Sequence, residues 1–123
     1  MQSLFLNIRG LGVPGHRTLL KVYLRKFKID ILCLQETIKQ DFTDQELRSL
    51  KVGEQFFWHW LPARGHSGGM LLGVRNNLLE VGNMDMDLYF LSLSVMHKPS
   101  NRIFEIIGIY ALPKIRRSLT FLS

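Results

Sequence analysis

Hydrophobic and polar positions change their spacing several times along the chain, and each change predicts an element. Residues 3–8 form a short apolar run that predicts a strand, and a glycine-containing turn follows at residues 9–15. Residues 29–34 are almost entirely apolar and predict a fully buried strand. The segment between the two strands has helical spacing, and its apolar face consists of Leu19, Leu20, Tyr23, Leu24 and Phe27. A strand, a helix and a second strand in this order favour a crossover with parallel or mixed pairing.

The rest of the chain predicts one more short helix and several strands. Thr43 and Glu46 have the spacing of a capping box, with Phe42 and Leu47 placed as a hydrophobic staple. Strands are expected at residues 56–60, 70–74, 91–95 and 103–110, with a turn at residues 98–101. The tail, residues 114–123, is interpreted as the opening of a third helix. Two helices and about six strands indicate a mixed α/β fold.

Composition limits the class of protein. The chain has 123 residues, of which 46% are hydrophobic, which is enough for one domain with a single core. Its formal net charge of +6 suits a polyanionic partner such as nucleic acid, although ordinary basic proteins share it. Cys33 is the only cysteine, which excludes an internal disulfide and a cysteine-based zinc site. We find no membrane-length apolar run and no secretory leader, and expect an intracellular chain, with the nucleus as one compartment open to it.

A carboxylate stands where the buried strand ends. Glu36 follows this strand, and Asn7 lies at the end of the first strand, so neighbouring strands would bring the two side chains together. Carboxylate and amide oxygens suit Mg²⁺, which also takes waters and substrate phosphate. On the pattern alone, the alternative that Glu36 simply leaves the sheet into solvent stays open.

Four blocks in order resemble the first half of the endonuclease/exonuclease/phosphatase superfamily. They are residues 7–12 (NIRGLG), 29–37 (IDILCLQET), 65–72 (GHSGGMLL) and 109–111 (IYA). Within that superfamily the chain is most similar to the apurinic-type endonuclease domain of plant non-LTR (LINE-type) retrotransposons. The resemblance implies a four-layer α/β sandwich of the deoxyribonuclease I-like type, of which residues 1–123 are the N-terminal half.

The resemblance also implies a site that hydrolyses a phosphodiester with a divalent metal, Mg²⁺ or Mn²⁺. Glu36 would be the metal ligand, Asn7 would belong to the metal and phosphate site, and Tyr110 would hydrogen-bond the scissile phosphate. The expected substrate contacts are Arg9, Lys39 and His66, with DNA as the partner. Lys39 stands one place later than the lysine of many relatives, because Ile38 intervenes.

Two motifs of the superfamily have no match in these 123 residues: the Asp-x-Asn motif and the late Ser-Asp-His motif. We therefore expect a truncated domain that is catalytically incomplete as it stands and associates through its exposed sheet. The alternative is a non-catalytic module, derived from that domain, that binds nucleic acid or protein. A third is that the sequence is a shortened version of an active nuclease.

Several other residues invite a functional interpretation that we do not favour. None of the four histidines, His16, His59, His66 and His97, has a carboxylate at a spacing that would orient it as a base. Residues 85–87 (DMD) are expected to be a solvated turn before a strand. The basic helix face, Arg17 to Lys28, is assigned to solubility, and the aromatic residues 56–60 are assigned to the core.

Overall fold

The computed structural model describes residues 1–50, 56–110 and 118–122. Within that part the chain forms two helices and eight strands. The helices are α1 (His16–Lys26) and α2 (Asp44–Ser49). The strands are β1 (Ser3–Asn7), β2 (Ile31–Gln35), β3 (Phe56–Leu61), β4 (Met70–Arg75), β5 (Leu79–Met86), β6 (Phe90–His97), β7 (Arg102–Tyr110) and β8 (Ser118–Leu122). Neither of these described helices is long and apolar enough to cross a lipid bilayer.

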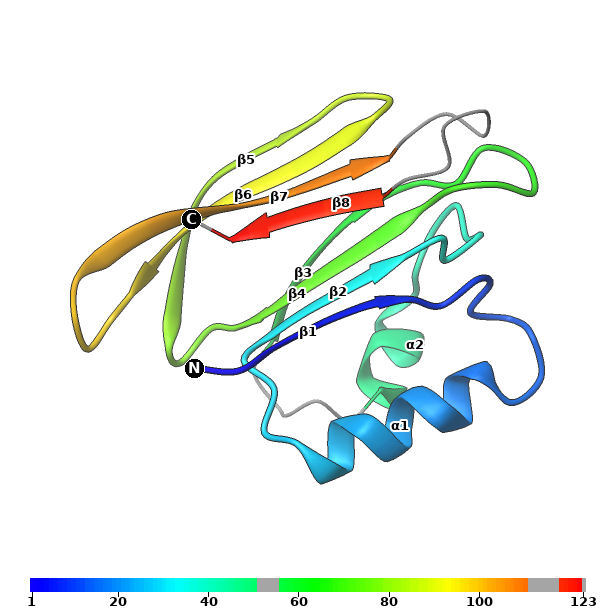
Figure 1. Cartoon of the computed structure of the whole chain (residues 1–123), viewed down its shortest axis with the longest axis horizontal. Helices are drawn as coiled ribbons and strands as arrows, with labels where there is room; N and C mark the ends of the chain where they lie inside the picture. Colours follow the sequence, from blue (N-terminus) through cyan, green and yellow to red (C-terminus); the bar gives the residue numbers. More distant parts are fainter. Residues whose placement is uncertain (51–55, 111–117, 123) are drawn as a thin grey trace.

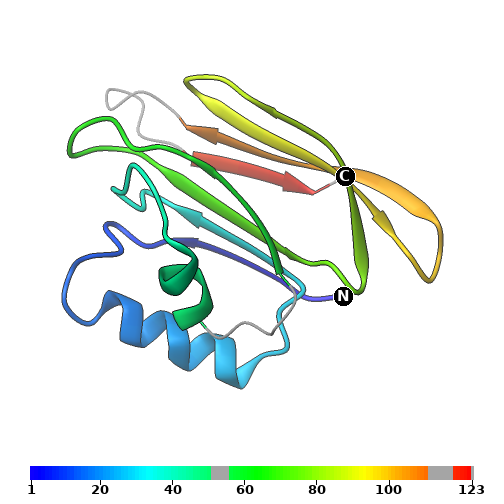
Figure 2. The same ribbon diagram turned by 180° about the vertical axis from the view of Figure 1, so that it is seen from behind.

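The elements form three layers (Figures 1 and 2). One sheet has the strand order β1-β2-β4-β3, and the other has the order β5-β6-β7-β8. Helices α1 and α2 cover the outer face of the first sheet, and the second sheet stacks on its inner face. Two groups of buried side chains fill the two spaces between these layers.

Strand β2 is central to this arrangement, and all five of its residues are buried. Leu32 and Leu34 belong to the core beneath the helices, whereas Ile31 and Cys33 belong to the core between the sheets. A strand covered on both faces has no solvent-facing side, which explains its continuous apolar run. It pairs in parallel with β1, placing Asn7 opposite Gln35, and antiparallel with β4. The predicted crossover and mixed sheet are therefore confirmed.

Helix α2 begins as its sequence predicts. The Glu46 backbone N–H donates to the Thr43 hydroxyl oxygen and the Thr43 backbone N–H donates to the Glu46 carboxylate, each at 3.1 Å. Phe42 and Leu47 are both buried in the core beneath the helices. The reciprocal cap satisfies two of the backbone donors that a helix start leaves open.

A charged pair fixes the start of β2. Asp30 is 6% exposed, and its carboxylate accepts hydrogen bonds from the Arg75 guanidinium at 3.1 Å and from the Gln2 backbone N–H at 2.9 Å. Arg75 also donates to the carbonyl of Ile29 at 2.7 Å. This pair ties together β1, β2 and β4 at the end of the sheet where β2 begins.

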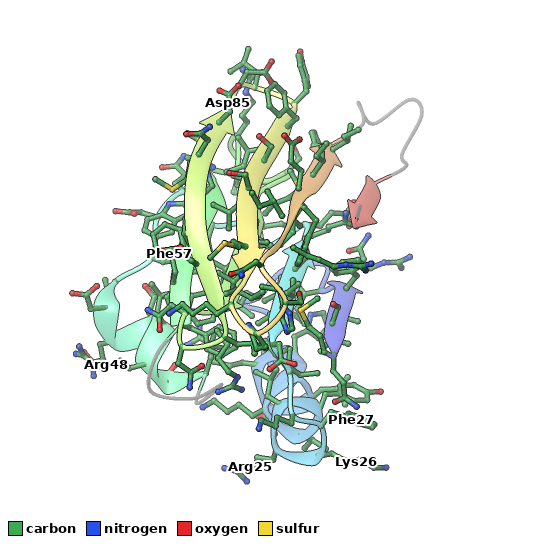
Figure 3. The ribbon with its side chains drawn as sticks, turned by 90° about the vertical axis from the view of Figure 1, so that its left-hand side faces the viewer. Arg25, Lys26, Phe27, Arg48, Phe57 and Asp85 are labelled. Carbon is green, nitrogen blue, oxygen red and sulfur yellow. The ribbon has the colours of Figure 1, made fainter. Side chains whose placement is uncertain are left out.

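The predicted core face of α1 is only partly right. Leu20 and Leu24 are buried, but Leu19 and Tyr23 are 50% and 38% exposed. Figure 3 shows Phe27 pointing away from the body of the molecule, on the same side as Lys26. The helix is turned so that Arg17, on its predicted outer face, reaches Glu46 of α2 at 3.7 Å. The helical period was therefore right, but the buried face is rotated toward the side that carries Arg17.

Two predictions for the second sheet are wrong. Residues 118–122 of the expected third helix form strand β8, which pairs antiparallel with β7, while residues 114–117 and 123 lie outside the described residues. Alternating small polar and apolar residues suit a strand once β7 offers a free edge. Asp85 and Met86 belong to β5 and not to a turn; only Asp87 lies beyond the strand. Pairing with β6 makes β5 a strand although most of its residues are exposed.

The aromatic residues of β3 lie where the core prediction put them. Phe56, Trp58 and Trp60 are half-buried against the core beneath the helices, and Phe57 packs against the core between the sheets. The ring of Trp60 meets that of Phe42 edge to face, with centroids 5.5 Å apart. Because β3 is an edge strand, these rings keep part of their surface exposed.

Candidate active site

The residues that the sequence singles out meet at one end of the molecule. Asn7 is the last residue of β1, Glu36 directly follows β2, and Tyr110 is the last residue of β7. Figure 1 shows these three strand ends, together with the β3–β4 and β5–β6 turns, on the right-hand side of the view. The exposed His66 lies in the β3–β4 turn, and the exposed Arg9 lies in the loop after β1.

The loops after β1 and β2 stay joined beyond the sheet. Three backbone hydrogen bonds continue the pairing: Ile8 N–H to the carbonyl of Gln35 at 3.0 Å, Gly10 N–H to that of Glu36 at 2.7 Å, and Leu11 N–H to that of Thr37 at 3.0 Å. These bonds hold the Glu36 backbone from the β1 side. Because Gln35 and Thr37 are bonded as well as Glu36, the backbone is fixed both before and after the residue that carries the carboxylate.

Three residues without the freedom of glycine adopt left-handed backbone conformations in these two loops. Their φ angles are 50° at Arg9, 54° at Glu36 and 54° at Ile38. Such conformations cost roughly 1–2 kcal/mol each for side chains with a Cβ atom. Strain of this kind persists only where surrounding contacts enforce it, and it gathers at functional sites.

The β3–β4 turn supplies the other half of the support. The Thr37 N–H donates to the carbonyl of Gly69 at 3.1 Å, and the Ile38 N–H donates to that of Gly68 at 2.9 Å. A Cβ atom at Gly69 would collide with the Thr37 hydroxyl, and one at Gly68 would stand 3.3 Å from the Tyr110 ring. The two glycines thus lie between the loop that carries Glu36 and the ring of Tyr110.

The donor set at this end fits a hard cation. Glu36 is half-buried, and no lysine or arginine of the described ranges forms an ion pair with it. The side-chain oxygen of Asn7 accepts the Arg9 N–H at 3.1 Å, which orients the amide while leaving its second lone pair open. Mg²⁺ is commonly held by one or two carboxylates, with waters and phosphate completing its shell. Within the described residues no cluster of three His, Cys, Asp or Glu could hold a metal, so Glu36 would be a single carboxylate ligand.

Lys39 faces the helix layer. Its ammonium lies 2.7 Å from the Glu46 carboxylate and 5.6 Å from the centroid of the Phe42 ring. Its hydrogen bond to Glu46, with the Thr43 cap, lowers the pKa of that carboxyl. The structure therefore brings Lys39 together with α2 and not with Glu36.

The remaining histidines have structural surroundings. His16 is bonded through Nδ1 to the carbonyl of Gly10 at 2.8 Å, and His97 through Nδ1 to the Ser100 hydroxyl at 2.8 Å. His59 is half-buried on β3, and desolvation lowers its pKa. In the described ranges, no histidine forms an ion pair with a carboxylate.

Two features of this site escaped the sequence interpretation. One is Thr37, which is 0% exposed and whose hydroxyl has no hydrogen-bond partner within the described part of the chain. The other is the pair of glycines at 68–69, which the sequence pattern indicated only as a turn, although their φ values of 79° and 88° are positions that favour glycine. The Gly-Gly dipeptide was the one available signal of a close backbone approach.

The fold and the site together define a class. Residues 4–94 match the model of the endonuclease/exonuclease/phosphatase family. The chain belongs to the endonuclease/exonuclease/phosphatase family. The mixed α/β architecture with two stacked sheets is the deoxyribonuclease I-like fold expected from the sequence.

A solved structure adds a particular relative. The crystal structure of the AP endonuclease LMAP from Leishmania major superposes with a TM-score of 0.68 at 17% sequence identity. The match covers 89% of this chain and 40% of the Leishmania enzyme. No curated protein matches the chain. At this identity the likeness concerns the fold.

Proposed function

We propose that this chain is the metal-binding and phosphate-binding part of a Mg²⁺-dependent DNA endonuclease of the LINE-type retrotransposon class. Residues 1–123 would be the first half of a four-layer domain. Their exposed sheet would pack against the second half of that domain. The observation that carries this proposal is the convergence of Asn7, Glu36 and Tyr110 at one end of the two sheets. The family membership supports nuclease chemistry, and the quoted sequence blocks support the retrotransposon type.

Glu36 is the residue we assign to the metal. Its half-buried carboxylate sits on a backbone held by hydrogen bonds to both flanking loops, at a left-handed φ of 54°. A bound Mg²⁺ would neutralise this charge and polarise a phosphoryl oxygen of the substrate. Asn7 would add an amide oxygen to the same site.

Tyr110 is the residue we assign to the phosphate. Its backbone N–H donates to the carbonyl of Tyr89 at 2.7 Å, and its ring lies against Gly68, so both its backbone and its ring contact neighbouring turns. A fixed phenol hydroxyl can donate a hydrogen bond to a phosphate oxygen. The exposed side chains of Arg9 and His66 flank this end of the molecule and can donate hydrogen bonds to neighbouring phosphates. Lys39 remains a proposed contact only if it leaves Glu46.

Catalysis would require a base that these 123 residues do not supply in a recognisable motif, so we propose that the chain alone is incomplete. Nicking of supercoiled plasmid by the purified chain, with Mg²⁺ and with EDTA, tests this. We expect no difference between the wild type and Glu36→Gln. Mg²⁺-dependent nicking that disappears in Glu36→Gln would overturn the incompleteness.

Metal binding needs its own measurement. Mn²⁺ binding, followed by the loss of its free electron paramagnetic resonance signal, is expected for the wild type and should weaken at least about tenfold in Glu36→Gln. Glu80→Gln, which changes an exposed carboxylate on β5, is the matched control and should bind as the wild type does. Equal binding by all three proteins would remove Glu36 from the metal site.

A second candidate function is a binding module without catalysis. The net charge of +6 and the exposed Arg9, Arg64 and His66 around the candidate site favour it. Binding of a fluorescent DNA duplex should then weaken steeply between about 50 and 200 mM salt, because phosphate contacts release counterions. Flat binding over that range would contradict this function.

A further inference from the structure

A pocket of about 370 Å³ opens between the β3–β4 connection and the turn from β5 to β6. Its residues Leu61 and Ala63 are 6% and 5% exposed and form a buried floor. Its rim includes Pro62 with Met86 and Leu88, which are 44% and 55% exposed. The volume falls in the range of roughly 300–1,000 Å³ that is typical of small-ligand sites. The mostly apolar lining suits a flat, uncharged group.

The pocket adjoins the candidate active site. A smaller hollow shares Leu88 and Arg64 with it and is also lined by Gly68 and Tyr110. The turns that form the pocket lie at the same end of the molecule as the ends of β2 and β7 (Figure 1). A nucleotide whose phosphate lies at Tyr110 therefore has this pocket within its immediate surroundings.

The charges around the pocket favour a base over a phosphate as its occupant. Asp87 lines the pocket, and its carboxylate accepts the N–H groups of Tyr89 at 2.7 Å and Phe90 at 3.1 Å. This negative charge, which stabilises the turn, would repel an anion inside. The Arg64 guanidinium lies 5.8 Å from the centroid of the Tyr89 ring and provides a cation at the rim for the backbone of a bound strand.

We propose that the pocket of about 370 Å³, here named the base pocket, holds one unstacked nucleobase of the nucleic acid bound at Tyr110. The inference rests on the proposed function and narrows its substrate class to a strand with an unpaired or extruded nucleotide. A base that leaves the stack loses pairing and stacking, and an apolar pocket of this size offers it replacement contacts. The basic net charge of +6 attracts the strand, and the pocket selects its unpaired position.

Fluorescence anisotropy in EDTA tests the selection without any cleavage. Two labelled duplexes, one with a single bulged adenine and one fully paired, are compared for binding. We expect the wild type to prefer the bulged duplex by about tenfold, the size of one stacked base. The double variant Leu88→Ser, Met86→Ser should lose this preference and keep its affinity for the paired duplex. The control Ile103→Ser, Met84→Ser removes two exposed apolar groups outside the pocket and should behave as the wild type does.

Carbon-13 labelling of the methionine methyl groups locates the base directly. Deoxyadenosine monophosphate should shift the Met86 methyl resonance by ring current and leave that of Met84 unchanged. Equal affinity for both duplexes with no Met86 shift overturns the base pocket. If neither duplex binds but deoxyadenosine monophosphate shifts the Met86 methyl resonance, DNA is not the substrate of the proposed function. The nucleobase then remains the ligand of the base pocket.

Discussion

The two ends of strand β2 carry carboxylates in opposite circumstances. Asp30, before the strand, is buried and bonded to Arg75 and to the Gln2 backbone. Glu36, after the strand, is half-buried on a left-handed backbone, and no cation of the described residues pairs with it. Both carboxylates directly flank the same apolar strand. Their residue types alone therefore do not show which one is structural and which one is free to bind a ligand.

The difference shows how the same side-chain chemistry serves structure at one end and ligand binding at the other. A buried, fully bonded carboxylate contributes to folding through its partners, and removing it leaves those partners unsatisfied. A carboxylate without a partner contributes little to folding. It therefore keeps its charge available for a cation, which is the role proposed for Glu36.

The contrast between Asp30 and Glu36 can be tested by the stability of two alanine variants. Asp30→Ala should lower the free energy of unfolding by roughly 3 kcal/mol, because it removes the carboxylate that pairs with the Arg75 guanidinium and accepts the Gln2 N–H. Glu36→Ala should change it by less than about 0.5 kcal/mol. Urea unfolding of both variants measures the two values. Similar losses would mean that Glu36 is a structural carboxylate after all.

The second prediction concerns the support of the candidate site. Gly69→Ala should destabilise the protein by roughly 2 kcal/mol, since its Cβ atom meets the Thr37 hydroxyl at a φ of 88°. Thr37→Val, which removes a buried hydroxyl without a partner in the described residues, should stabilise it by about 1 kcal/mol. Thermal unfolding of both variants provides the measurement. A destabilised Thr37→Val would show that the hydroxyl has a partner outside the described ranges.

A third titratable group, His59, should make the stability of the protein depend on pH. Desolvation lowers its pKa in the folded state below the ordinary 6.5, and a hydrogen bond to the Asp85 backbone offsets this only in part. As the pH falls through 6.5, the unfolded chain takes up the proton first, so the free energy of unfolding should decrease. Above pH 6.5 this contribution is fully present. His59→Leu should flatten the profile between about pH 5 and 7 in urea titrations; an unchanged slope would exclude His59 as its source.

The smallest expected effect separates the two interpretations of Lys39. Lys39→Met should cost about 0.5 kcal/mol of stability, the typical value of a partly exposed ion pair, and should raise the pKa of Glu46. DNA affinity should stay within about twofold of the wild type if Lys39 serves α2. A larger loss of affinity, measured by anisotropy, would restore it as a phosphate contact.

Local patterns in the sequence predicted most of the first sheet and its helices. The capping box at Thr43 and the apolar run of β2 are short-range signals, and both elements formed where they indicated. Strands β5 and β8 were missed because their neighbours β6 and β7 supply the pairing that makes them strands, and that pairing is not visible within their own residues. The direction in which α1 turns its buried face depends on the elements that it packs against, and the periodicity within α1 gives only the spacing.

The sequence placed Asn7 and Glu36 at neighbouring strand ends, where the structure has them, but it gave no sign of the backbone conformation around them. Strand ends converge at one edge of a sheet, so the amino-acid pattern alone could place Asn7 and Glu36 together. The left-handed conformations at Arg9, Glu36 and Ile38 have no sequence signal, because none of these residues favours them. The hydrogen bonds of three separate loops impose them.

The single cysteine gives the molecule a built-in reporter. Cys33 is 1% exposed, lies in the core between the two sheets and stands opposite Leu72 in the β2–β4 pair. A thiol reagent can reach it only when the sheets separate or the chain unfolds. Its labelling rate, followed as denaturant is raised, would therefore time the opening of the space between the layers and tell a local parting of the sheets from global unfolding.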